Sequence, residues 1–191
     1  MKLVFATHNK NKFREVKAQM PDHIELLSLT DINCFDKIPE TEETIEGNAL
    51  LKARYVKKTF GIDCFADDSG LEVAALNNGP GVYSARYAGP EKSAEANNQK
   101  LLNALQNETN RSARFKTVIA LTLNDEEHLL TGLCPGEITR APRGTGGFGY
   151  DPIFQPDGFD RTFAEIPLSI KTQIGHRGKA VAQLLDYLNI K

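Results

Sequence analysis

The chain has 191 residues, of which 40% are apolar and 25% charged, as is typical of a globular domain. A net charge of −2 and a pI near 6.1 argue against a long electrostatic contact with nucleic acid, although a compact anion pocket needs only a few local cations. The length predicts a single domain over residues 1–191. The chain has three cysteines but no Cys-x-x-Cys pair, and its first apolar run is too short for a signal peptide, which together predict a cytoplasmic protein. Because no apolar stretch is long enough to cross a bilayer, no membrane partner is expected.

In the first half of the chain, apolar runs alternate with helical periodicities. Strands are expected at Leu3–Ala6, Ile24–Leu27 and Asp63–Ala66, the last ending at two aspartates. Helices are expected at Asn11–Met20, stopped by a proline, and at Gly47–Phe60, capped by a glycine. The acidic segment between residues 30 and 44 has no period and is expected to be a loop.

The second half begins with a turn cluster at Asn77–Gly81. A helix is expected at Glu91–Leu105, a hairpin of strands at Phe115–Leu123 and His128–Thr139, and a last helix at Arg177–Leu188. Strands that alternate with helices, together with a hairpin, predict an α/β fold with a mixed twisted sheet and flanking helices.

The first strand leads into a segment rich in hydroxyl, amide and ammonium groups. These donors suit phosphate, which gathers at the carboxyl ends of strands where helices begin. The alternative is a purely structural role, in which Asn9 only caps the helix and the lysines are solvated. The segment comprises Thr7, His8, Asn9, Lys10, Asn11 and Lys12.

Adjacent carboxylates at Asp67 and Asp68 suit a hard divalent cation, since Mg²⁺ takes one or two protein carboxylates together with water and phosphate oxygens. If the strand continues, the two acids point to opposite faces, so that only one of them can face a cleft directly. Asp68 and Ser69, at the expected strand-to-loop transition, are the better placed pair. A second acid must come from elsewhere, and the segment Pro39–Glu43 is the richest source. An Asp-Ser-Gly turn with solvated acids is the alternative.

A glycine-rich turn at Gly144–Gly149 matches Gly-x-Gly-x-x-Gly, but no helix is expected after it, which excludes a dinucleotide fingerprint. Close approach of the backbone to a ligand is the better use of these glycines, with the Phe148 ring stacked on a base and Asp151 accepting from ring N–H groups. A plain loop with Phe148 in the core is the alternative. Near the C-terminus, Lys171 could meet phosphate or a base edge, and Arg177 could donate to an exocyclic carbonyl.

The sequence thus offers hydrogen-bond donors for phosphate, carboxylates for a metal ion and an aromatic ring for a base. Together these predict that the ligand is a nucleoside triphosphate. In combination, the motifs resemble the inosine triphosphate pyrophosphatase family along nearly the whole chain. They are Thr-x-Asn-x-x-Lys from Thr7, Asn48-Ala49, Lys52-Ala53-Arg54, Ala66–Leu71, Gly81–Tyr87, Gly144–Pro152 and Gly175–Gly178.

The resemblance implies a homodimer of elongated, two-lobed α/β subunits, each with a central cleft, that uses Mg²⁺ to hydrolyse ITP, dITP and XTP to the monophosphate and pyrophosphate. It implies that Glu40 and Asp68 hold the metal and that Asp68 also orients or deprotonates the attacking water. The triphosphate would be bound by the segment from Thr7 to Lys12 with Lys52 and Ser69. The base pocket would comprise Phe148, Gly149, Tyr150, Asp151, Lys171, His176 and Arg177.

The chain departs from the family pattern in three places. His8 stands where the family usually has glycine, and Gly175 replaces a common serine. The family glutamate beside Asn48 is absent, which leaves Glu42, Glu43 and Glu46 as alternatives to Glu40. Rival interpretations are a related pyrophosphatase acting on ordinary pyrimidine triphosphates, a nucleotide sensor without turnover and a nucleic-acid-binding module.

Overall fold

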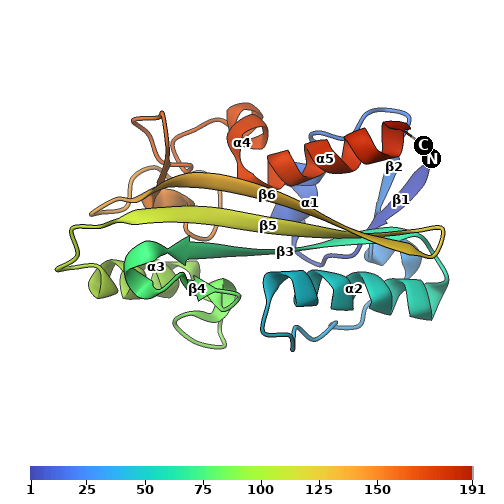
Figure 1. Ribbon diagram of the computed structural model, residues 1–191, viewed down its shortest axis with the longest axis horizontal. Coiled ribbons are helices and arrows are strands. Elements are labelled where there is room, and N and C mark those ends of the chain that lie inside the picture. Colours follow the sequence, from blue (N-terminus) through green and yellow to red (C-terminus); the bar gives the residue numbers. More distant parts are fainter. Residues whose placement is uncertain (191) are drawn as a thin grey trace. The chain divides into compact units, whose positions relative to one another are not determined.

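The computed structural model describes residues 1–190, and these divide into two compact units (Figure 1). The first unit comprises Met1–Asp68, Thr117–Gly132 and the chain from Arg177 onward, and the second comprises Ser69–Lys116 and Leu133–His176. Among the residues described, no helix is both long and apolar enough to cross a membrane.

Seven strands pair into one mixed sheet, as expected for the fold class. The order is β2 (Glu25–Ser28), β1 (Lys2–Phe5), β3 (Cys64–Val73), β5 (Ser112–Leu123), β6 (Glu126–Ile138) and β7 (Phe154–Pro156), with β4 (Gly79–Gly81) paired to β3. β1 runs parallel to both β2 and β3, whereas β4 is antiparallel to β3 and β7 to β6.

In the first unit, helices cover both faces of the sheet (Figure 1). Apolar residues of α1 (Lys10–Lys17) and α5 (His176–Ile190), such as Val16 and Leu184, pack with Phe5, Phe65 and Ile119 of the strands. The opposite face is covered by α2 (Ile45–Phe60), and the buried Cys64 thiol donates to the backbone carbonyl of Ala53 in that helix.

The second unit has its own apolar core. Leu101 of α3 (Ala94–Ala104) and Ile174, the last residue of α4 (Leu168–Ile174), contribute to a cluster that includes Phe115, Phe154 and Phe163. The three phenylalanine rings lie within 6.0 Å of one another between centroids.

Some expected elements are confirmed closely. α2 ends at Phe60 with Gly61 in the left-handed conformation, as its capping role requires. The hairpin between β5 and β6 turns at Asn124 and Asp125, both with positive φ. α1 is shorter than expected, since Ala18 is already its C-cap, and α3 begins at Ala94 after the Ser93 cap. The turn cluster also contains β4.

The expectation that the third strand ends before the two aspartates is wrong. β3 continues through Asp67, Asp68 and Ser69 to Val73. These polar residues are tolerated within a strand because both carboxylates lie against cations. Placing Asp68 and Ser69 at a strand-to-loop transition is therefore wrong as well.

Candidate active site

The first strand ends in a loop whose side chains cap α1. Asn9 Oδ1 accepts hydrogen bonds from the backbone N–H groups of Asn11 (3.0 Å) and Lys12 (3.2 Å), and Thr7 Oγ1 accepts from the N–H of Asn9. The capping role considered for Asn9 is thus confirmed. Since the cap already engages two amide donors at the start of α1, a phosphate here would depend on side-chain donors.

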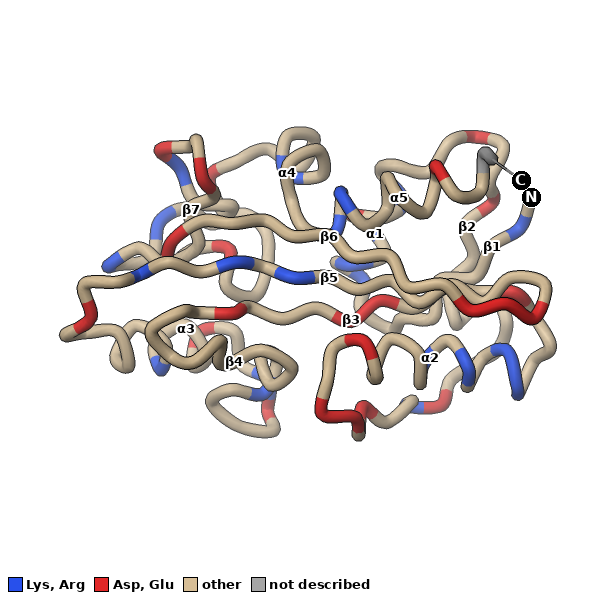
Figure 2. The backbone as a smooth tube through the Cα atoms, in the orientation of Figure 1, with Lys and Arg blue, Asp and Glu red and all other residues tan. Residues whose placement is uncertain are grey.

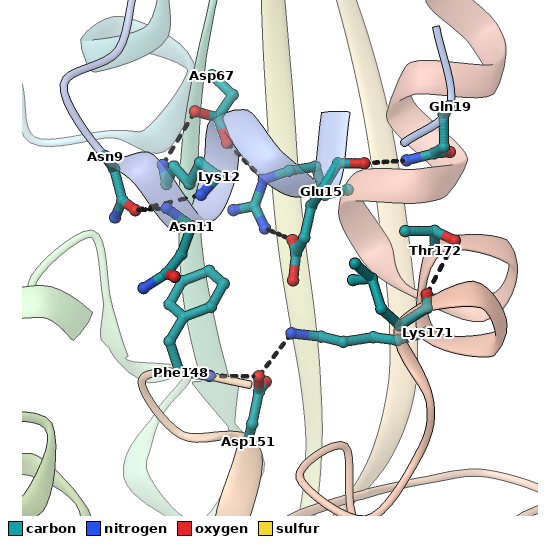
Figure 3. Close-up of polar contacts among 12 residues, drawn as sticks. Asn9, Asn11, Lys12, Glu15, Gln19, Asp67, Phe148, Asp151, Lys171 and Thr172 are labelled. Atoms are coloured by element: carbon teal, nitrogen blue, oxygen red, sulfur yellow. Dashed lines mark hydrogen bonds and ion pairs between the residues drawn. The ribbon is translucent and has the colours of Figure 1, made fainter. Parts of the chain in front are cut away.

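A buried chain of alternating charges links α1, β3 and α5. Asp67 is 1% exposed, and one of its carboxylate oxygens lies 3.0 Å from Lys12 Nζ (Figure 3). The other carboxylate oxygen lies 3.0 Å from Arg177 Nε. Arg177, which is 3% exposed, also donates through Nη1 to the carboxylate of Glu15. These residues come from far apart in the sequence, and each charge is compensated by the next.

Burial and the neighbouring charges shift the pKa values of Asp67 and Lys12. Burial by itself raises the pKa of Asp67, but the neighbouring charges of Lys12 and Arg177 outweigh it and hold that pKa well below its usual range. Burial lowers the pKa of the Lys12 ammonium, with Asp67 opposing the change. Asp67 is therefore an ionised counter-ion for two cations.

Asp68, the next residue, lies in a different ionic environment. Lys52 of α2 places its ammonium 2.8 Å from Glu40 Oε1 and 3.5 Å from Asp68 Oδ1. Burial raises the pKa of Asp68, and the charges of Lys52 and Lys12 offset this only in part. For Lys52 itself, burial lowers the pKa, but Asp68 and Glu40 outweigh it and raise the pKa overall. Asp68 is thus more basic than an ordinary aspartate and shares the Lys52 ammonium with Glu40, which is typical of a general base or a metal ligand.

The donor set around Lys52 fits Mg²⁺. Glu40 and Asp68 present hard carboxylate oxygens that already lie around one cationic group. Within residues 1–190, no three His, Cys, Asp or Glu side chains are arranged to hold a metal ion. A magnesium ion here would have two protein carboxylates and would take its other ligands from water and substrate phosphate, as Mg²⁺ commonly does.

The acidic segment that carries Glu40 comes directly before α2 (Figure 2), and several hydrogen bonds hold it in place. Tyr55 of α2 donates its hydroxyl to Asp36 at 2.6 Å, and His8 Nε2 lies 2.9 Å from the Asp36 carbonyl oxygen. Buried Asn48 exchanges two hydrogen bonds with the backbone of Glu42. His8 is thus a link between the loop before α1 and the acidic segment.

In the second unit, the glycine-rich turn wraps a buried ion pair. Asp151 is 2% exposed, and its Oδ2 accepts from Lys171 Nζ at 2.5 Å and from the Phe148 N–H at 2.8 Å (Figure 3). The Lys171 ammonium also lies 4.8 Å from the centre of the half-buried Phe148 ring. At Gly147, φ is +70° and an added Cβ would come within 2.0 Å of Asp151 Oδ2, so glycine is required.

Other contacts hold this turn. The side-chain amide of Asn98, in α3, donates to the Gly149 carbonyl at 3.1 Å, and the Tyr150 hydroxyl donates to the Ser84 carbonyl at 2.8 Å. His176 is buried, with its ring stacked on Phe115 at 4.5 Å.

The predicted site residues therefore fall into two groups. The first unit contains the loop that begins at Thr7. It also brings together the ion-paired residues Lys12, Glu40, Lys52, Asp68 and Arg177. The second unit brings together Phe148, Asp151 and Lys171, with Gly149, Tyr150 and His176 nearby in the chain or packed in the same core, and it also contains Ser69.

Sequence reasoning missed Glu15, and it considered Asp67 only as the less well placed of two possible metal ligands. Glu15 is 4% exposed, although it lies in a short amphipathic helix among lysines. Its position directly before the buried Val16 could have indicated that Glu15 is buried too. Nothing in the sequence indicates that its partner is Arg177, which follows 162 residues later.

Comparison with known proteins gives consistent matches along the chain. The sequence profile of the Ham1 family matches residues 3–187. A protein from Flavobacterium johnsoniae named dITP/XTP pyrophosphatase is 63% identical over 188 residues, which cover 98% of each chain. One of the same name from Christiangramia forsetii is 60% identical over 189 residues, covering 99% of this chain and 100% of the relative.

Two solved structures are also similar. A HAM1 protein from Coxiella burnetii matches with a TM-score of 0.92 and 41% identity over 100% of both chains. The Ham1 protein of Staphylococcus aureus matches with a TM-score of 0.90 and 42% identity over 99% of this chain and 98% of that one.

Proposed function

The chain belongs to the Ham1 family, and from that premise we propose that it hydrolyses noncanonical purine nucleoside triphosphates to the monophosphate and pyrophosphate. It is a hydrolase of the anhydride bonds in nucleoside triphosphates. The observation that carries the proposal is the 63% identity to a dITP/XTP pyrophosphatase over nearly the full length of both proteins. The substrates proposed are dITP, XTP and ITP.

Magnesium dependence is part of the proposal, and the charges of the first unit support it. Four carboxylates, those of Glu15, Glu40, Asp67 and Asp68, lie among three cations, those of Lys12, Lys52 and Arg177. A triphosphate is a polyanion, so a divalent ion is needed to bring it to such a cluster. Bound to Glu40 and Asp68, Mg²⁺ would supply charge neutralisation and a more acidic water.

The protein groups have separate parts in the reaction. Asp68, with its raised pKa, orients the attacking water and accepts its proton, and the attack is in line on the phosphorus that joins nucleotide to pyrophosphate. Lys12 and Lys52 neutralise charge that develops on the leaving pyrophosphate. Thr7 and Asn9 donate hydrogen bonds to phosphate oxygens.

Base selection is assigned to the second unit. The purine stacks on Phe148, and Lys171 can donate but not accept hydrogen bonds. The 6-oxo group of hypoxanthine or xanthine meets such donors favourably, whereas the 6-amino group of adenine would set donor against donor. An unpaired buried polar group costs about 1–3 kcal/mol, or roughly ten- to a hundredfold in rate per contact.

Product analysis tests the reaction. XTP or dITP is incubated with the protein and Mg²⁺, and monophosphate, pyrophosphate and orthophosphate are measured separately. Equal amounts of monophosphate and pyrophosphate are expected. Orthophosphate as the first product would overturn the proposed bond, and binding without any product would indicate a sensor. The homodimer implied by the family resemblance is also proposed, and light scattering of the purified protein tests it.

A further inference from the structure

Lys52 lies between the two acids that the proposed function assigns to the metal. Its side chain is buried, with the residue 7% exposed, and its ammonium contacts oxygens of both Glu40 and Asp68. The contacts reach across elements, because Glu40 belongs to the acidic segment, Lys52 to α2 and Asp68 to β3. One cationic group thus bridges both carboxylates.

A divalent ion at these carboxylates would share their oxygens with the ammonium. Two cations held by the same oxygens repel one another strongly, because a buried site screens charge poorly. Lys52 therefore disfavours a bare metal ion at this place. The lysine side chain is long and flexible, so its ammonium can leave the carboxylates when another anion offers it a partner.

We propose that Lys52 is an internal competitor of the metal: it weakens binding of a divalent ion alone and transfers its ammonium to phosphate oxygens when the ion arrives with a triphosphate. The inference rests on the proposed function, since it takes Glu40 and Asp68 as the metal ligands. Its consequence is selectivity for the metal–nucleotide complex over the free ion. Lys52 is thus both a phosphate ligand and a positioning residue.

The proposal predicts effects of opposite sign for two ligands. Mn²⁺ alone is titrated into the protein and free Mn²⁺ is followed by electron paramagnetic resonance. Lys52→Met should bind Mn²⁺ about tenfold more tightly than the unaltered protein, because the ammonium no longer competes. Calorimetry with tripolyphosphate in the presence of Ca²⁺ should show about tenfold weaker binding to the same variant, because a phosphate ligand is lost.

Matched variants separate this effect from general damage. Lys57→Met removes another ammonium of α2, one that pairs with Asp63 and Asp125, and should leave Mn²⁺ affinity unchanged within about twofold. Asp68→Asn added to Lys52→Met should abolish the gain, which assigns the ion to that carboxylate. Lys52→Gln repeats both titrations with a polar neutral side chain, in case the methionine variant folds poorly.

Each outcome decides the proposal. Tighter Mn²⁺ binding with weaker tripolyphosphate binding supports it, whereas equal or weaker Mn²⁺ binding in both Lys52 variants overturns it. If no variant binds Mn²⁺, the assignment of Glu40 and Asp68 as metal ligands is wrong, and this inference is wrong with it. If the opposite signs are found but XTP yields no pyrophosphate, the proposed reaction fails and the competition stands.

Discussion

Asp67 and Asp68 are neighbours in β3, yet their carboxylates contact different cations. Asp67 Oδ1 lies 3.0 Å from Lys12 Nζ, whereas Asp68 Oδ1 lies 3.5 Å from Lys52 Nζ. Successive side chains in a strand point to opposite faces, so continuation of β3 through both residues separates them. The two acids therefore lie in different environments: Asp67 pairs with Lys12 and Arg177, and Asp68, paired with Lys52, is the one proposed to hold metal and water.

Asp68→Asn should lower kcat by about 100-fold or more, because an amide cannot accept the proton of the attacking water. Nucleotide binding should remain measurable by calorimetry. Asp63→Asn is the matched control, since Asp63 lies just before the same strand and pairs with Lys57. A near-normal rate for Asp68→Asn would remove it from the proposed mechanism.

Asp67→Asn should lower the free energy of unfolding by about 3–5 kcal/mol at neutral pH, because it removes the buried carboxylate that Lys12 and Arg177 share and leaves Arg177 with Glu15. The folded pKa of Asp67 is depressed, so its stabilisation is fully present above the unfolded pKa of about 3.9 and is lost progressively as pH falls from that value toward the lower folded pKa. Urea unfolding between pH 7 and pH 3 measures the difference from the unaltered protein. The difference should shrink on acidification, and growth instead would contradict the assigned sign.

Gly147→Ala should disrupt the glycine-rich turn, because its Cβ would overlap the Asp151 carboxylate in addition to the strain of positive φ. KM for XTP should rise at least about tenfold, corresponding to one lost polar contact. Gly149→Ala is the control, since φ is +63° there but an added Cβ meets nothing within 4 Å. Steady-state kinetics measure KM for both variants. An equal rise in KM for Gly147→Ala and Gly149→Ala would contradict the role given to the contact between Gly147 and Asp151.

Lys171→Met should destabilise the protein by about 3–5 kcal/mol, because Asp151 would be left as a buried charge without its cation. Adding Asp151→Asn removes that charge and should recover part of the loss in thermal unfolding. If the double variant is no more stable than Lys171→Met, the pair is not the source of the loss.

The fold and family were readable from the sequence because they depend on local signals. Apolar periodicity with a glycine cap located α2, a polar turn located the β5–β6 hairpin, and the motif combination predicted the family that the profile match confirms. The bounds of β3 were wrong, since Asp-Asp-Ser-Gly has the composition of a turn. The strand accommodates these acids because Lys12, Arg177 and Lys52, from distant parts of the chain, lie against their carboxylates.

The ionic partners could not be predicted from the sequence. Arg177 was expected to face a base, yet two of its guanidinium nitrogens donate to Asp67 and Glu15. Those pairs join residues 110 and 162 positions apart, a separation at which no local pattern operates. The role of Arg177 in base recognition stays a prediction.

Initial rates of pyrophosphate release from ITP, dITP and XTP, with ATP and GTP in parallel at equal Mg²⁺, measure whether the protein selects noncanonical purines. We expect kcat/KM to be at least about tenfold higher for the noncanonical triphosphates than for ATP, because the 6-amino group of adenine would set a donor against the donors of the base pocket. Equal pyrophosphate release from ATP and ITP would contradict this expectation.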